Sequence, residues 1–140
     1  MIAKLKIGKI DYRKLNGRQK ENYNFQKISG ILADYGFATI RLSDDWNGAD
    51  FIAQHADGKT LLRVQLKGRL HVAKKYEGKD LWLCFPADGE WYLGPHDEIL
   101  SCLLKSTGIE RTESWRKRGG YSYRALPKRV AAILEGFLLK

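Results

Sequence analysis

Residues 47–69 read NGADFIAQHADGKTLLRVQLKGR, and this stretch decides the fold of the chain. Strand-forming residues fill two arms, and the dipeptide Asp57-Gly58 between them is a turn signal, so the stretch predicts a hairpin. Apolar and polar residues alternate on the second arm, where Leu62, Val64 and Leu66 are interleaved with Arg63, Gln65 and Lys67. Successive side chains of a strand point to opposite faces, so this strand has one buried face and one polar face.

The polar residues of this hairpin could hold a divalent cation. Gln65 and Lys67 stand two residues apart on the second arm, and Asp50 lies on the first arm. Each of them alone would more often be structural, Asp as a turn former and Gln-x-Lys as a solvated strand face. Together they place a carboxylate, an amide and an ammonium group at one end of the hairpin.

An amphipathic helix is expected before the hairpin, from about Arg18 to Tyr35. Its apolar residues fall at i, i+3, i+7 and i+10, which lie on one face of a helix, and Gly36 is a natural residue to end it. One turn earlier the same face reaches Glu21, a carboxylate either at the rim of the core or aimed at a site.

The remaining pattern predicts an α/β domain. Strands are expected at 37–42, 81–85 and 90–93, a polar turn at 43–48, and helices after Pro95 and after Pro127. This order predicts a central mixed sheet of about five strands flanked by helices. We divide the single domain into a basic arm (1–16), a core (17–94) and a C-terminal part with helices and a basic loop (95–140).

The chain of 140 residues carries a formal net charge of +9, which implies a polyanionic partner. Nucleic acid is expected before membrane, because no apolar run approaches the roughly 20 residues that a spanning helix needs. Cys84 and Cys102 lie in apolar surroundings without CxxC spacing, which is typical of free thiols in a reducing compartment. A cytoplasmic protein is therefore expected.

The sign of the charge reverses locally. Residues 34–58 hold five acidic residues against one basic residue, Arg41. An acidic pocket inside a basic protein suits metal-dependent phosphodiester chemistry, because the pocket binds the cation and the surroundings hold the polyanion.

Two basic segments are candidates for contacting the nucleic-acid backbone. One directly follows the second arm of the hairpin, and the other lies near the C-terminus among aromatic residues. The candidate residues are Arg69, His71, Lys74, Lys75, Arg116, Lys117 and Arg118. The alternative interpretation is that both segments are solvated loops. The basic arm at the N-terminus is open to the same two interpretations, a contact to phosphates or a solvated tail.

Gly48-Ala49-Asp50-Phe51-Ile52 and Gln65-Leu66-Lys67 resemble the motif of the PD-(D/E)xK nuclease superfamily. The resemblance covers roughly residues 17–85 and implies a restriction-endonuclease-like fold with an αβββαβ core and a C-terminal helical extension. Two positions depart from the motif: Ala49 replaces the proline, which carries no ligand, and Gln65 replaces an acidic residue. Glutamine at this position resembles subgroups that are similar to methylation-dependent restriction endonucleases and to some homing endonucleases.

The resemblance implies a Mg²⁺ site, with Mn²⁺ as a substitute, held by the Asp50 carboxylate, the Gln65 amide oxygen and the Leu66 carbonyl. An acidic residue of the first helix completes the site in resolvase-like members, which points to Glu21, with Asn22 and Gln26 as competitors. Lys67 would stand beside the water that attacks the phosphodiester bond.

These observations predict a Mg²⁺-dependent endonuclease acting on duplex or branched DNA. A small domain of this kind cuts one strand per site, so a homodimer or higher oligomer is expected. The alternatives are a non-catalytic nucleic-acid-binding protein that retains the fold, and an RNA-associated or assembly protein that uses its charge alone.

Overall fold

The structure is a computed structural model that describes residues 6–140, without the side chain of Asp45. Helix α1 (Gly17–Asp34) begins at a capping box in which the backbone N–H of Gln19 donates to Asn16 Oδ1 at 2.8 Å. Gly36, with φ of +88°, follows the helix in the left-handed region that glycine tolerates. The predicted first helix is thus confirmed in type and extent.

Two antiparallel hairpins follow α1. Their strands are β1 (Phe37–Trp46), β2 (Ala49–His55) and β3 (Leu61–Leu66). The expected polar turn at 43–48 is wrong, because β1 continues to Trp46 and only Asn47-Gly48 turns the chain, with φ of 54° and 90°. Asn-Gly suffices for this turn because both residues tolerate positive φ.

The main sheet has the strand order β1-β2-β3-β5-β6, completed by β5 (Trp82–Ala87) and β6 (Glu90–Pro95). Only β3 and β5 pair in parallel, so the sheet is mixed, as predicted. The crossover between them contains no α-helix. It consists of the short strand β4 (His71–Ala73) and the 3-10 turn η2 (Lys74–Tyr76).

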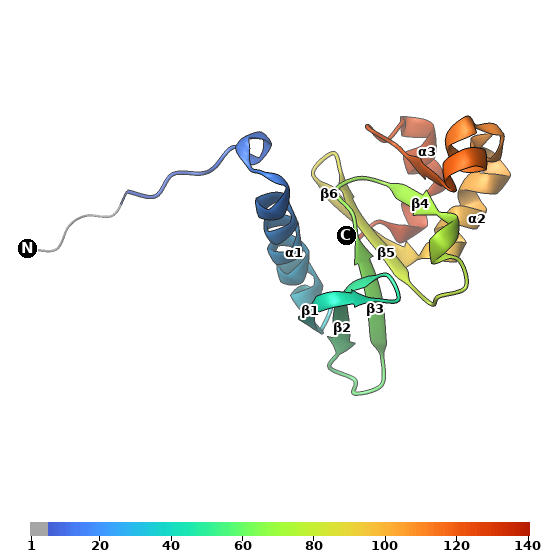
Figure 1. The fold of residues 1–140 in the computed structure, drawn as a ribbon. Helices are drawn as coiled ribbons and strands as arrows, with labels where there is room; N and C mark the ends of the chain where they lie inside the picture. The colour runs from blue at the N-terminus through green and yellow to red at the C-terminus, as the bar shows by residue number, and fades with distance from the viewer. Residues whose placement is uncertain (1–5) are drawn as a thin grey trace, which may run out of the picture.

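Helices cover both faces of the sheet (Figure 1). On one face α1 packs Ile28 and Leu32 against Phe51 of β2 and Val64 of β3. On the other face Leu83 and Phe85 of β5 pack against α2 (His96–Ser106) and α3 (Lys128–Ile133). Cys84 belongs to the cluster under α1, so β5 is buried on both faces.

A second sheet of two strands joins segments that lie far apart in the sequence. β4 pairs antiparallel with β7 (Gly120–Ser122), with His71 opposite Ser122. Two short helical segments, η3 (Ile109–Arg111) and the π-helix η4 (Ser114–Arg118), lead from α2 to β7.

The chain ends on β6. The predicted terminal helix is shorter than expected, because α3 stops at Ile133 and the 3-10 turn η5 (Glu135–Phe137) follows. The backbone N–H of Leu139 donates to the Trp91 carbonyl at 2.8 Å, so the C-terminal segment covers the outer edge of β6.

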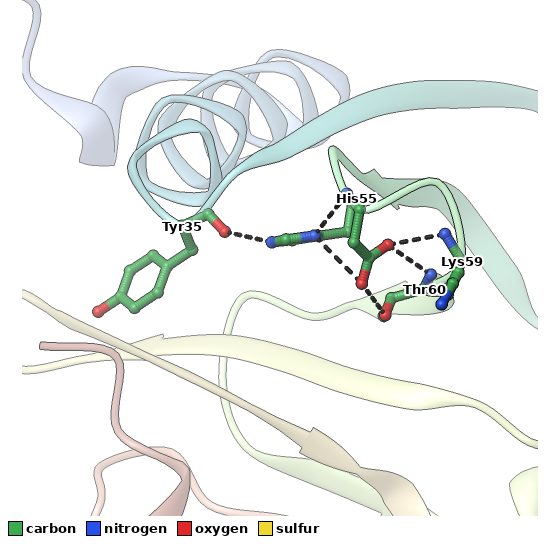
Figure 2. A network of polar contacts seen from close by, with 5 residues as sticks. Tyr35, His55, Lys59 and Thr60 are labelled. Carbon is green, nitrogen blue, oxygen red and sulfur yellow. Dashed lines mark hydrogen bonds and ion pairs between the residues drawn. The ribbon is translucent and has the colours of Figure 1, made fainter.

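The β2–β3 turn is fixed to the end of α1 by a polar network (Figure 2). The Asp57 N–H donates to His55 Nδ1 at 3.0 Å, so His55 Nε2 carries the proton donated to the Tyr35 carbonyl, also at 3.0 Å. Asp57 Oδ1 accepts the backbone N–H groups of Lys59 and Thr60 at 2.7 and 2.8 Å. This network closes the hairpin at the end away from Asp50.

The described part of the N-terminal arm runs away from the sheet (Figure 1). It includes the 3-10 turn η1 (Tyr12–Lys14), and the first five residues of the predicted arm lie outside the described residues. Within residues 6–140, no helix has the length and apolar character needed to cross a membrane.

Candidate active site

The candidate site lies where β2 and β3 separate. Phe51 and Val64 form the last backbone pair at this end of the two strands. One step further, the backbone N–H of Leu66 donates to Asp50 Oδ2 at 2.8 Å. A side-chain carboxylate thus takes the place of a backbone carbonyl, and the two strands diverge around it.

A cleft of about 710 Å³ opens at this point, with walls from α1, β1, β2 and β3. The predicted site residues Glu21, Asp50, Gln65, Leu66 and Lys67 all line it. Residues separated by up to 46 positions are therefore brought to one cavity, Glu21 from the helix and Lys67 from the end of β3.

The candidate ligands differ in their exposure. Asp50 and Glu21 are exposed, whereas Gln65 is only 8% exposed. The Leu66 N–H points towards Asp50 and the Lys67 N–H donates to the Cys84 carbonyl of β5 at 2.9 Å. Because N–H and C=O of one strand residue point to the same edge, the Leu66 carbonyl faces the Asp50 side.

Lys67 is half-buried, and its ammonium group lies 5.5 Å from the centre of the Tyr76 ring. Tyr76 is itself buried, in η2 of the crossover. The ring face attracts a cation, so it holds the Lys67 side chain near the cleft without neutralising its charge.

Three residues of α1 are candidates for the ligand that the first helix would add to the site. Glu21 lines the cleft, while Asn22 hydrogen-bonds the Arg41 guanidinium through its Oδ1. Gln26 is exposed and does not line the cleft. The buried Asn24, which sequence analysis did not consider, also lines it and donates to the Tyr12 hydroxyl at 3.0 Å.

The residues present fit a hard divalent cation. Among the described residues no three His, Cys, Asp or Glu side chains form a group that could hold a metal ion. The candidate set instead has two carboxylates, Asp50 and Glu21, with an amide oxygen and a backbone carbonyl. Mg²⁺ accepts such an oxygen set, because it usually takes one or two carboxylates and completes its octahedron with water and phosphate oxygens.

Sequence analysis missed three charged residues of the cleft: Arg18, Arg41 and Asp44. Asp44 was assigned to a turn, although it lies on β1. The two-residue turn signal Asn47-Gly48 could have placed it on the strand. Arg41 also lies on β1, where its guanidinium stacks 5.4 Å from the centre of the Phe25 ring.

Beside the cleft lie two basic hollows of about 390 and 560 Å³. Five of the seven predicted backbone-contacting residues line them: Arg69, His71, Lys74, Lys75 and Arg118. The other two, Arg116 and Lys117, lie outside both hollows, and Lys117 forms an exposed ion pair with Glu113 at 2.9 Å.

His71 is neutral at neutral pH. Burial, and then the positive charges of Lys67, Lys75 and Arg69, lower the pKa of His71 to about 4. Its Nδ1 atom lies 2.6 Å from the Ser122 hydroxyl across the β4–β7 pair. His71 can therefore exchange hydrogen bonds without adding a charge of its own.

Comparison with known proteins finds likeness only among solved structures, because no family model and no curated protein matches the chain. One structure is the Holliday junction resolvase Hjc of Archaeoglobus fulgidus, with 16% identity and a TM-score of 0.45 over 56% of this chain and 74% of that one. Another is a bacterial homing endonuclease, with 17% identity and a TM-score of 0.48 over 88% of this chain and 86% of that one.

Proposed function

We propose that the protein is a Mg²⁺-dependent endonuclease that hydrolyses phosphodiester bonds in duplex or branched DNA. One observation carries the proposal: Asp50, Gln65 and Lys67 line a single open cleft at the point where β2 and β3 separate. This cleft lies in a chain of net charge +9, which attracts the polyanion that the cleft would cut.

Four groups would hold the cation in this proposal: the carboxylates of Asp50 and Glu21, the Gln65 amide oxygen and the Leu66 carbonyl. When bound, Mg²⁺ activates a water molecule and polarises the phosphoryl oxygen. The N–H of Leu66 orients the Asp50 carboxylate through its 2.8 Å hydrogen bond. Gln65 itself is buried in the wall of the cleft.

Lys67 would act on the reacting phosphate. Its ammonium group can hydrogen-bond the attacking water and oppose the negative charge that develops on the phosphoryl oxygens. Tyr76 holds this ammonium at the boundary between the cleft and the adjoining hollow, since Lys67 lines both.

Each chain offers one such cleft, and the two strands of a duplex run antiparallel. Cutting both strands at one place therefore requires a second copy related by a two-fold axis, and we propose a homodimer or higher oligomer. Light scattering on the free protein and on its DNA complex tests this proposal. A single copy per duplex that nicks only one strand would contradict it.

A non-catalytic nucleic-acid-binding role is the second candidate, favoured by the neutral amide of Gln65 at a position where an acidic ligand would bind the cation more strongly. Supercoiled plasmid incubated with the protein and Mg²⁺ or Mn²⁺ distinguishes the two. The endonuclease nicks or linearises the plasmid, whereas the binding protein shifts its mobility without breaking a strand.

Lys67→Ala is the decisive variant, and Lys59→Ala is its matched control. Lys59 is an exposed lysine in the turn of the same hairpin, outside the cleft. Lys67→Ala should lower the nicking rate by roughly 100-fold while plasmid binding persists. Wild-type protein that binds plasmid but nicks it with neither metal would overturn the proposed hydrolysis.

A further inference from the structure

The two hollows beside the cleft join into one basic surface on the β4–β7 sheet. We call it the basic groove and define it by Arg69, His71, Lys74, Lys75, Arg118 and Ser122. His71 and Ser122 line both hollows, and Lys67 and Gly68 line both the nearer hollow and the cleft. The groove is therefore continuous with the cleft.

The charge of the groove has one sign. None of the residues that line the two hollows is acidic, whereas the cleft contains Glu21, Asp44 and Asp50. In the described part of the chain, no cation of the groove forms an ion pair with a carboxylate. Unpaired cations gathered in this way are suited to bind an anion.

Aromatic rings hold two of these cations in place. The ammonium group of Lys74 lies 5.3 Å from the centre of the Trp115 ring, and that of Lys75 lies 5.3 Å from the centre of the Tyr76 ring. Both rings are buried. The rings orient the lysine side chains while leaving their positive charge available to a ligand.

The backbone beneath the groove is also fixed. The buried His96 accepts the Ala73 N–H through its Nε2 at 3.2 Å, and its Nδ1 lies 2.9 Å from Asp97 Oδ1. The other Asp97 oxygen accepts the Gly78 N–H at 2.9 Å. These bonds tie both ends of η2 to α2 and support the backbone beneath the groove.

The His71 ring lies between Ser122 and Gly120. A Cβ atom at residue 120 would lie 3.1 Å from His71 Cε1, so glycine leaves room for the ring. The neutral imidazole and the Ser122 hydroxyl then offer hydrogen bonds beside the cations, and phosphate oxygens accept hydrogen bonds while carrying charge.

From these contacts we infer that the basic groove binds phosphates of the nucleic-acid backbone outside the cleft, on the path by which a strand enters or leaves it. The inference rests on the proposed function for the identity of the polymer. In this arrangement the cleft holds the phosphate to be cut and the groove holds its neighbours, so the groove determines affinity and the cleft determines rate.

The test compares two double variants that each remove two positive charges. Lys74→Gln/Arg118→Gln removes cations of the groove, and the matched control Lys105→Gln/Lys128→Gln removes exposed cations of α2 and α3 that line neither the hollows nor the cleft. Binding to a short duplex is measured by fluorescence anisotropy in EDTA over a range of salt concentrations. Thermal melting confirms that each variant is folded.

The groove variant should reduce the magnitude of the slope of log K against log salt by about 1.8, since each phosphate contact contributes about 0.9. The control variant should leave the slope unchanged. Equal changes in both variants, or no change in either, would overturn the inference.

Gly120→Ala provides a test that alters no charge. By displacing the His71 ring it should weaken binding several-fold without changing the salt slope. Unaltered affinity in this variant and in His71→Ala would remove His71 from the inferred site.

Nicking kinetics separate this inference from the proposed function. If both hold, the groove variant raises KM for plasmid and leaves kcat unchanged. If the protein never nicks DNA but the groove variant shows the predicted loss of slope in EDTA, the inference about the groove holds and the proposed hydrolysis is wrong. If the protein nicks DNA but the groove variant changes neither the salt slope of binding nor KM, the proposed hydrolysis holds and the inference about the groove is wrong.

Discussion

At the level of single residues, the Asp50 carboxylate connects the shape of the cleft to its proposed chemistry. It accepts the Leu66 N–H at 2.8 Å and is exposed to the cleft. Asp50→Asn retains a side-chain acceptor but loses the charge, so nicking should fall by roughly 100-fold or more with little change in melting temperature. Asp50→Ala should lose activity and also about 1 kcal/mol of stability.

Activity that survives Asp50→Asn at the wild-type level would remove Asp50 from the proposed cation site. Plasmid nicking and thermal melting, both recorded with and without Mg²⁺, provide the measurements for this pair of variants.

Gln65→Glu tests whether the neutral amide weakens the proposed cation site. Residue 65 is only 8% exposed, so a carboxylate placed there is poorly hydrated. The new carboxylate would also be repelled by Asp50, which lines the same cleft, so the variant should melt at a lower temperature in EDTA. Mg²⁺ should restore the melting temperature and support nicking at roughly tenfold lower concentration, since a ligand charge has been added.

Gln54→Glu is the matched control, because Gln54 is an exposed glutamine on the adjacent strand, outside the cleft. Its melting temperature should not respond to Mg²⁺. A Gln65→Glu protein that is equally insensitive to Mg²⁺ would show that this part of the cleft binds no cation.

At the level of elements, the β2–β3 turn should give the fold an acid-sensitive end. Hydrogen bonds from the Thr60 backbone and hydroxyl and from the Lys59 backbone hold the pKa of Asp57 well below its usual value near 3.8. A carboxylate with a depressed folded pKa stabilises the protein above its unfolded pKa and loses this contribution as the pH falls. Wild type should therefore melt higher than Asp57→Ala at pH 7, and the difference should shrink below about pH 4.

Melting curves between pH 7 and pH 3 measure this difference. A constant difference across that range would mean that the Asp57 charge does not contribute to the stability of the turn.

The C-terminal segment should depend on a close contact between β6 and η5. A Cβ atom at Gly94 would lie 2.3 Å from Cδ1 of the Phe137 ring, so Gly94→Ala forces the ring away from the sheet. The expected loss is about 1–3 kcal/mol in the free energy of unfolding. Gly136→Ala, where a Cβ atom meets nothing within 4 Å, is the matched control and should cost little.

Denaturant unfolding of both variants gives the comparison. Equal stability of the two would show that the terminal segment can leave β6 without cost.

Sequence predicted the elements that are specified locally. The period of α1 and the turn signal Asp57-Gly58 are each contained in a few residues. The turn before β2 was expected over residues 43–48, so the length of β1 was underestimated. The β4–β7 sheet was not predicted, because its strands have three residues each and pair His71 with a residue 51 positions away. Such short strands show no alternation to detect.

The same distinction applies to the site. Asp50, Gln65 and Lys67 belong to one hairpin, so their grouping could be inferred from its register. Arg18 and Asp44 reach the cleft from α1 and β1, and their presence follows from how these elements pack. Sequence indicated two separate basic segments, and only the fold shows that they form one groove.

At the level of the whole molecule, acidic and basic groups are arranged for different ligands. The net charge of +9 attracts a polyanion, and the lining of the basic groove is free of acidic residues, whereas the cleft sets three carboxylates against Arg18, Arg41 and Lys67. Under the proposed function, nucleic acid should therefore bind without Mg²⁺ mainly through the basic groove, and Mg²⁺ should strengthen the hold of the cleft on a phosphate.

This arrangement predicts a nicking rate that passes through a maximum as Mg²⁺ is raised. The rising limb reflects the cation required in the cleft, and the falling limb reflects competition by Mg²⁺ for the phosphates that the basic surface must hold. Lower NaCl should move the falling limb to higher Mg²⁺, because the polymer is then held more tightly, whereas the rising limb should move little. Plasmid nicking at two NaCl concentrations tests both limbs, and a rate that only saturates with Mg²⁺ and ignores NaCl would contradict the separation of roles between cleft and groove.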